Sequence, residues 1–230
     1  MPINYIDELN ETQYEAVVYN EGPSLVIAGA GSGKTRVLTY KIAYLLENGY
    51  APWNILALTF TNKAAREMKK RIAGMVSEKR TQALFMGTFH SLFSRILRVE
   101  AAHLGFSSQF TIYDTADTKS LLRSISKEMG LDEKIYKTGA VQSRISHAKN
   151  RLILPSAYAS NRDVYENDCR VKMPAIRDIY LQYWNRCRQA NAMDFDDLLF
   201  YAFILFRDFP DVLSRYQEQF RYVLVDEYQD

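Results

Sequence analysis

Residues Ser24 to Thr35 read SLVIAGAGSGKT, an apolar run followed by a glycine-rich loop and a Lys-Thr pair. The run Leu25-Val26-Ile27 predicts a buried β-strand, and the residues after the loop predict a helix. Three glycines in the loop, Gly29, Gly31 and Gly33, allow a tight turn whose backbone N–H groups converge on one point. The N-terminus of the helix adds positive potential there. This order of elements predicts a loop that binds phosphate groups.

Individual roles follow from the chemistry of this loop. Lys34 would reach the β- and γ-phosphates of a nucleotide, and the Thr35 hydroxyl would be a ligand of Mg²⁺. The usual pattern opens with glycine, whereas this chain has the small residue Ala28. A glycine-rich turn that binds nothing is the alternative, and the sequence of strand, loop, Lys-Thr and helix argues against it. The expected phosphate-loop residues are Ala28, Gly29, Ala30, Gly31, Ser32, Gly33, Lys34 and Thr35.

The composition is that of a folded globular protein, with 230 residues, 47% of them hydrophobic and 24% charged. The formal net charge is only +2, but the charges are unevenly placed. Residues 61–98 hold nine Lys or Arg and two Glu, whereas residues 186–230 hold five Arg and nine acids. The basic block suggests a polyanionic partner, and a solvated helix face is the alternative explanation.

Cysteine usage and hydropathy exclude several classes of protein. Cys169 and Cys187 are the only cysteines and form no Cys-x-x-Cys motif, which argues against a zinc site or a disulfide framework. The acidic N-terminus, MPINYIDELN, has no apolar core, so no export signal is expected. No apolar run approaches the roughly 18 residues that a membrane span needs. We therefore expect a cytoplasmic protein with no membrane partner.

The first 91 residues alternate strands and helices. Strands are expected at Ile55–Phe60 and Ala83–Phe89, with helices after Thr35 and from near Lys63. The second helix is expected to turn Ala65, Met68 and Ile72 inward. This alternation predicts parallel pairing and right-handed crossovers. Ahead of the first strand, Asn10 is expected to cap a helix with Gln13 at the capping-box position. The Gln13 amide could instead read the edge of adenine, because one amide both donates and accepts, and the spacing leaves both roles open.

Helical patterns dominate after Ser91, which predicts a helical insertion. Helices are expected at about 91–104, 115–129, 138–149, 173–190, 195–206 and 210–219, with a short extended piece at 110–113. A small basic cluster of Arg144, Lys149 and Arg151 is expected to be a solvated face. The acids of Asp194-Phe-Asp-Asp197 suit a helix N-terminus, and a metal cluster is the weaker alternative.

A second chemical signal lies at the C-terminal end of the sequence. Tyr222–Val225 predicts a buried strand, with Asp226 and Glu227 at its end. In nucleotide hydrolysis, an acid at this place holds Mg²⁺ and a neighbouring Glu orients and deprotonates the attacking water. Asp226 would take the first role and Glu227 the second, while Gln229 and Asp230 could report the state of the phosphates to other parts of the protein.

Together these motifs resemble the UvrD/PcrA/Rep type of superfamily 1 DNA helicases. The resemblance covers the whole chain in order, and its segments are LNETQ at 9–13, AGAGSGKT at 28–35, LTFTNKAA at 58–65, GTFHS at 87–91, DFDDLL at 194–199 and VDEYQD at 225–230. It implies that Gln13 contacts adenine and Arg36 packs on its face. It implies that Lys34, Asp226 and Glu227 act in ATP hydrolysis, with Thr35 and Asp226 serving Mg²⁺.

The same resemblance predicts the DNA contacts. From the residues alone, Phe60 is equally well a base-stacking platform or core, and a lone His90 is more often structural than catalytic. The resemblance places both on a track for single-stranded DNA, and it implies that the substrates include junctions of single- and double-stranded DNA. The expected DNA-binding residues are Phe60, Thr61, Asn62, Lys63, Thr88 and His90.

The expected fold is α/β, an incomplete RecA-like P-loop NTPase parallel sheet with an all-helical insertion domain. The expected domains are 1A, at residues 1–91 and 212–230, and 1B, at residues 92–211. The family has a second RecA-like domain whose arginines complete the ATP site, so this chain is expected to be an N-terminal part with feeble hydrolysis alone. The family's strand after the acid pair lies between the acid strand and the phosphate-loop strand, which predicts an open sheet edge here.

The resemblance implies a 3′-to-5′ translocase and helicase driven by ATP, acting in DNA repair. Two alternatives share these motifs. One is the motor part of a recombination helicase–nuclease, and the other is an ATP-gated DNA-binding module that does not unwind.

Overall fold

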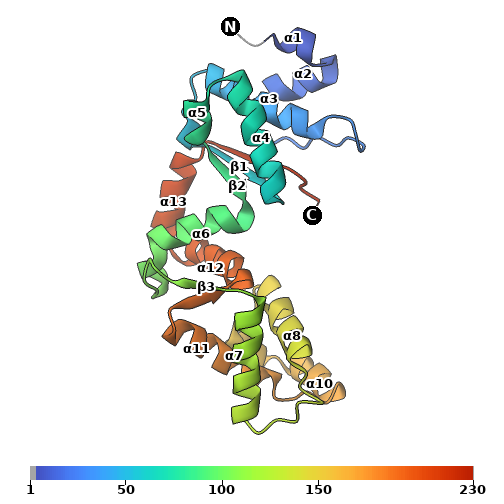
Figure 1. Ribbon diagram of the computed structural model, residues 1–230, viewed down its shortest axis with the longest axis vertical. Coiled ribbons are helices and arrows are strands. Elements are labelled where there is room, and N and C mark those ends of the chain that lie inside the picture. The colour runs from blue at the N-terminus through green and yellow to red at the C-terminus, as the bar shows by residue number, and fades with distance from the viewer. Residues whose placement is uncertain (1–3, 230) are drawn as a thin grey trace. The chain divides into compact units, whose positions relative to one another are not determined.

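The computed structural model describes residues 4–229, and these form two compact units (Figure 1). Unit 1 is Met1–Leu92 with Asp211–Asp230, and unit 2 is Phe93–Pro210. Unit 1 contains a parallel sheet covered by helices, and unit 2 is mainly helical. The expected α/β fold class is confirmed.

The sheet of unit 1 has three strands within the described residues. They are β1 (Ile55–Thr59), β2 (Phe85–Thr88) and β5 (Tyr222–Val225), in the order β2-β1-β5. All pairings are parallel, and Ala57 lies opposite Met86 on one side and Leu224 on the other. The helices of unit 1 are α1 (Tyr5–Glu8), α2 (Glu11–Val18), α3 (Lys34–Glu47), α4 (Asn62–Met75), α5 (Glu78–Gln82), the start of α6 (Phe89–Glu100) and α13 (Pro210–Gln219), with a 3-10 turn η1 (Pro52–Asn54).

Helices α3 and α4 cover one face of this sheet (Figure 1). The expected inward face of α4 is confirmed, because Ala65, Met68 and Ile72 are buried at helical spacing. These side chains leave the opposite face of α4 free to carry its basic residues. The cluster that joins the helices to the sheet contains Ile42, Leu45, Leu46, Ile55, Ala57, Met68, Ile72, Leu84 and Met86.

The expected strand at Leu25–Ile27 is wrong. Residues 24–29 take no strand conformation, and the Leu25 and Ile27 side chains are 66% and 88% exposed. A strand is held by hydrogen bonds to a neighbour. In the described part of the chain no strand pairs with this stretch, and β5 is the edge of the sheet. The apolar pattern alone therefore does not bring Leu25–Ile27 into the sheet.

Unit 2 packs its helices around a separate core. Two short strands, β3 (Thr111–Tyr113) and β4 (Ala192–Asp194), pair in parallel. Tyr180 and Tyr183 are the largest fully buried side chains of this core. The remaining elements are the rest of α6, η2 (Ala101–Leu104), α7 (Thr115–Glu128), α8 (Thr138–Asn150), α9 (Pro155–Ser160), α10 (Arg162–Arg170), α11 (Ile176–Gln189) and α12 (Phe195–Asp208).

Most expected helices of the insertion are confirmed with small shifts, and three elements were not expected. The helix expected from residue 173 begins at Ile176, because Lys172 takes a left-handed conformation and the Met173 N–H bonds to the Asp168 carbonyl, 2.8 Å away. The unexpected elements are α9, α10 and β4. None of the helices within residues 4–229 is both long and apolar enough to cross a membrane.

Candidate functional site

The glycine-rich loop ends in a backbone conformation that favours glycine. Gly31 and Gly33 have φ of +77° and +89°, and Gly33 caps the N-terminus of α3. A Cβ atom on Gly33 would lie 2.8 Å from the Gln13 Nε2 atom. Ala28 is not among the non-glycine residues with positive φ, so alanine causes no backbone strain there. The loop therefore tolerates the departure at Ala28 but depends on Gly33.

Two side chains at the end of the loop donate hydrogen bonds to carbonyl oxygens at its start. The Lys34 ammonium donates to the carbonyl oxygens of Ala28 at 2.9 Å and Gly29 at 3.1 Å. The Ser32 hydroxyl also donates to the Gly29 carbonyl, at 2.7 Å. An ammonium group held only by neutral carbonyls can exchange these bonds for stronger ones to phosphate oxygens. A contact of Lys34 with phosphate stays a prediction.

Gln13 links the first helices to this loop. Its backbone N–H donates to Asn10 Oδ1 at 2.8 Å, and its Oε1 accepts from the Asn10 N–H at 3.2 Å. The expected capping box of α2 is therefore confirmed. Gln13 Nε2 also donates to the Ser32 carbonyl at 3.0 Å, so the amide is held against the loop. A contact of Gln13 with adenine stays a prediction.

Arg36 lies one residue beyond Thr35 and contacts α1. Its Nη2 atom donates to the Glu8 backbone oxygen at 2.6 Å and to Glu8 Oε2 at 2.9 Å. The Tyr40 hydroxyl donates to the same carboxylate at 3.1 Å. Sequence reasoning missed Glu8, because its partners are 28 and 32 residues away and no local pattern joins them.

The acid pair follows β5, as expected. The Asp226 N–H donates to the Leu58 carbonyl at 2.9 Å, which continues the ladder between β5 and β1. Burial, and then the charge of Glu227, raises the pKa of Asp226, whereas the nearby Lys34 ammonium opposes this rise. Glu227 is in the left-handed region at φ +55°, and the Gln229 amide donates to its carboxylate. Asp230 lies outside the described residues.

One cavity of about 350 Å³ is lined by the two predicted Mg²⁺ ligands, Thr35 and Asp226, and by Glu227. Thr35 comes from the first turn of α3, and Lys34 is not part of the lining. Glu67 and Arg71 were not among the predicted site residues, although Ala64, Met68 and Arg71 share one face of α4 at the spacing i, i+4, i+7. The full lining is Thr35, Thr59, Phe60, Thr61, Ala64, Glu67, Met68, Arg71, Asp226 and Glu227.

The donor set of this cavity fits Mg²⁺. The Thr35 hydroxyl and the Asp226 carboxylate are oxygen donors of the kind that hard divalent cations take. They face the same space, and Lys34 is close enough to Asp226 to act on its pKa. A cation there would also relieve the repulsion between Asp226 and Glu227, which otherwise lie side by side at the end of one strand.

The predicted DNA-binding residues lie at the carboxyl ends of adjacent strands. Thr59 of β1 pairs with Thr88 of β2, so the segments that follow the two strands begin at one edge of the sheet. Phe60 is 63% exposed, which excludes core packing as its role. Asn62 and Lys63 are exposed, and His90 is half-buried.

Two of these predicted residues already have local structural roles. The Thr61 hydroxyl caps α4 by accepting from the Ala64 N–H at 3.1 Å. Thr88 is buried, and its hydroxyl accepts from the Ser91 N–H at 3.3 Å. Contacts of all six predicted residues with DNA stay predictions.

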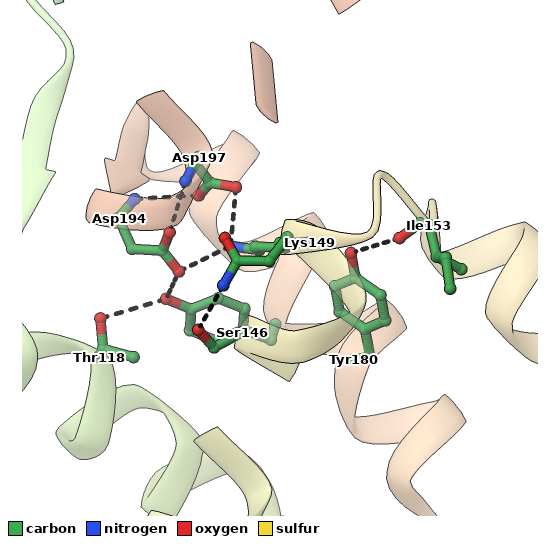
Figure 2. A network of polar contacts seen from close by, with 9 residues as sticks. Thr118, Ser146, Lys149, Ile153, Tyr180, Asp194 and Asp197 are labelled. Atoms are coloured by element: carbon green, nitrogen blue, oxygen red, sulfur yellow. Dashed lines mark hydrogen bonds and ion pairs between the residues drawn. The ribbon is translucent and has the colours of Figure 1, made fainter. Parts of the chain in front are cut away.

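The acids at 194–197 are structural in unit 2. Asp194 caps α12 in a capping box with Asp197, as the helix-terminus explanation predicted. Figure 2 shows Lys149 between the two carboxylates, at 2.6 Å from Asp194 Oδ2 and 2.7 Å from Asp197 Oδ1. The expectation that Lys149 belongs to a solvated face is wrong, because its side chain is buried in this network. Residues 4–229 contain no group of three or more His, Cys, Asp or Glu side chains placed to hold one metal ion.

The network in unit 2 shifts the pKa values of its two carboxyl groups in opposite directions. Burial opposes ionisation of Asp194, but the Lys149 ammonium and the Tyr183 hydroxyl hold the pKa of Asp194 below its usual range. Burial raises the pKa of Asp197 to about 7 against the attraction of Lys149. Arg144, from the same predicted basic cluster, pairs with the buried Asp168. Arg144 and Lys149 therefore neutralise buried carboxylates inside unit 2.

Comparison with known proteins identifies relatives for the whole chain. The family described as UvrD/REP helicase N-terminal domain matches residues 9–230. The ATP-dependent DNA helicase PcrA of Bacillus subtilis is 43% identical over 99% of this chain and 31% of its own length. PcrA of Leuconostoc citreum is 43% identical over 96% of this chain and 29% of its own. The ATP-dependent DNA helicase UvrD1 of Mycobacterium tuberculosis is 45% identical, over 98% and 29%.

Proposed function

The chain belongs to the UvrD/REP helicase family, and on that premise we propose that it is the N-terminal part of an ATP-dependent DNA helicase. The chain spans about 30% of the length of the relatives that it matches. In this proposal unit 1 is the ATP-binding domain 1A and unit 2 is the insertion domain 1B. The protein translocates 3′-to-5′ on single-stranded DNA, unwinds duplexes at junctions and acts in DNA repair in the cytoplasm.

The phosphate loop and the acid pair carry the chemistry in this proposal. Residues 28–33 and Lys34 hold the triphosphate, and Gln13 and Arg36 contact the adenine. Thr35 and Asp226 hold Mg²⁺, which when bound neutralises phosphate charge. Glu227 orients and deprotonates the attacking water. Lys34 stabilises the charge that develops on the phosphate oxygens.

The cavity shared by Thr35, Asp226 and Glu227 is the observation that most supports this proposal. The same cavity is lined by Phe60 and Thr61, which belong to the predicted DNA track. Residues proposed for ATP hydrolysis and residues proposed for DNA binding thus line one cavity, which supports a link between the two activities. Movement of the segment at Phe60 on binding DNA would alter the cavity in which ATP is hydrolysed.

Stimulation of ATP hydrolysis by DNA tests the function. We expect phosphate release by the full-length protein to rise at least about tenfold on adding single-stranded DNA, because helicase turnover is coupled to movement along the strand. The 230-residue chain alone should hydrolyse ATP feebly, since arginines from a second domain contribute about 10³- to 10⁵-fold in comparable phosphoryl transfer. A full-length protein that binds DNA but shows no stimulation would favour a DNA-binding module and refute the motor.

A further inference from the structure

The carboxylate of Glu8, at the end of α1, accepts hydrogen bonds from two side chains of α3. Arg36 donates to Glu8 Oε2 at 2.9 Å and Tyr40 donates to the same oxygen at 3.1 Å. A second bond, from Arg36 to the Glu8 backbone oxygen at 2.6 Å, makes the contact two-pronged. The guanidinium also lies 5.5 Å from the centre of the Tyr40 ring. Arg36 is thereby restricted in its orientation although it lies at the surface.

Helix α1 is itself anchored to α3. The Tyr5 hydroxyl donates to Glu47 Oε2 at 2.6 Å. The Tyr5 ring makes edge contacts with Tyr40 and Tyr44, with ring centres 6.1 and 5.9 Å apart. Leu9, next to Glu8, is buried with Val17 and Val37 in a small apolar cluster. These contacts fix the position of the Glu8 backbone relative to the phosphate loop.

Gln13 and Arg36 both lie next to Gly33, the last glycine of the phosphate loop. A Cβ atom placed on Gly33 would lie 2.8 Å from Gln13 Nε2 and 3.7 Å from the Arg36 Cβ atom. Each is held by a partner from residues 8–10, Gln13 by Asn10 and Arg36 by Glu8. A planar guanidinium and a carboxamide next to a phosphate loop are groups that suit the planar base of a nucleotide, by stacking and by hydrogen bonding.

We propose that Glu8 is a positioning residue that orients Arg36 for contact with the purine base of a bound nucleotide. The proposal rests on the nucleotide-binding function proposed above. Pre-orienting a side chain lowers the entropy lost on binding, so removal of Glu8 should weaken the base contact and leave the phosphate contacts intact. Because the pair is exposed, its effect on affinity should be modest.

Paired titrations of the 230-residue chain test this proposal. One titrant is ADP with Mg²⁺, and the other is inorganic tripolyphosphate with Mg²⁺, which offers phosphates without a base. The variants are Glu8→Ala, Arg36→Ala and their double variant. Glu15→Ala, which removes an exposed carboxylate from α2, is the matched control.

We expect Glu8→Ala to weaken ADP binding about fivefold and to leave tripolyphosphate binding unchanged. It should have no further effect in the Arg36→Ala background, because Glu8 acts through Arg36. Glu15→Ala should bind both ligands normally.

Three outcomes would overturn the proposal. Unchanged or tighter ADP binding by Glu8→Ala would show that Glu8 does not orient Arg36 for the base. Equal losses for ADP and tripolyphosphate would show that Glu8 acts on the phosphate loop. If the unchanged chain binds neither ligand, the proposed nucleotide site fails and the role of Glu8 fails with it. The first two results leave the proposed phosphate loop standing.

Discussion

Glu227→Gln is expected to slow ATP hydrolysis by the full-length protein about 10²- to 10⁴-fold, because it removes the general base. The substitution keeps the length of the side chain and an oxygen that can accept from Gln229. Nucleotide affinity should therefore change by less than about threefold, a change within about 0.7 kcal/mol. Phosphate release gives the rate, and equilibrium titration with ATP and Mg²⁺ gives the affinity.

The matched control is Glu218→Gln, which changes an exposed glutamate on α13 of the same unit. This variant should hydrolyse ATP at the normal rate. A Glu227→Gln protein that keeps its turnover would remove Glu227 from the mechanism. A tenfold loss of affinity would instead assign Glu227 to holding the nucleotide.

Lys149→Met is expected to destabilise unit 2 by about 3–5 kcal/mol, the usual cost of removing one partner from a buried ion pair. Lys149 is the cation between Asp194 and Asp197 (Figure 2), and all three side chains are buried. Without it, two neighbouring carboxylates must either stay charged in the interior or take up protons. Hydrogen exchange should show loss of protection in α8, α11 and α12, the helices that meet at the network.

Two further variants separate the charge effect from the loss of a side chain. Lys119→Met removes an exposed lysine of α7 and should leave protection unchanged. Adding Asp194→Asn and Asp197→Asn to Lys149→Met should restore much of the lost stability, because no unpaired charge remains. If Lys149→Met alone is as stable as the unchanged protein, the network does not hold unit 2 together.

Local patterns predicted the parts of the fold that depend on near neighbours. The Asn10–Gln13 capping box, the buried face of α4 and the loop before α3 each involve residues close in sequence. Leu25–Ile27 shows the limit of such patterns. Its composition suits a strand, but a strand forms only beside another, and none of the described strands pairs with it. The strand β4 has three residues, too few for an alternating pattern to show.

The candidate site shows the same division. The sequence predicted Lys34 and Thr35 at the start of the helix after the glycine-rich loop, and Asp226 and Glu227 after a strand, and the structure has them at these places. Other polar side chains, such as Arg36 and Lys149, have partners in distant segments of the chain, which local spacing does not predict. Glu8 lies 28 residues from Arg36, and Lys149 lies 45 residues from Asp194. A lysine that appeared to be one of a surface cluster is therefore an interior residue, which only the tertiary structure shows.

The most direct measurement is ATP hydrolysis by the full-length Lys34→Met protein with single-stranded DNA present. Lys34 and Thr35 are proposed to act on the same triphosphate as Asp226 and Glu227. Loss of the ammonium should lower the rate at least about 10²-fold, the scale found for removing one group that stabilises transition-state charge. A Lys34→Met protein that hydrolyses ATP at the unchanged rate would contradict the proposed site and, with it, the proposed motor.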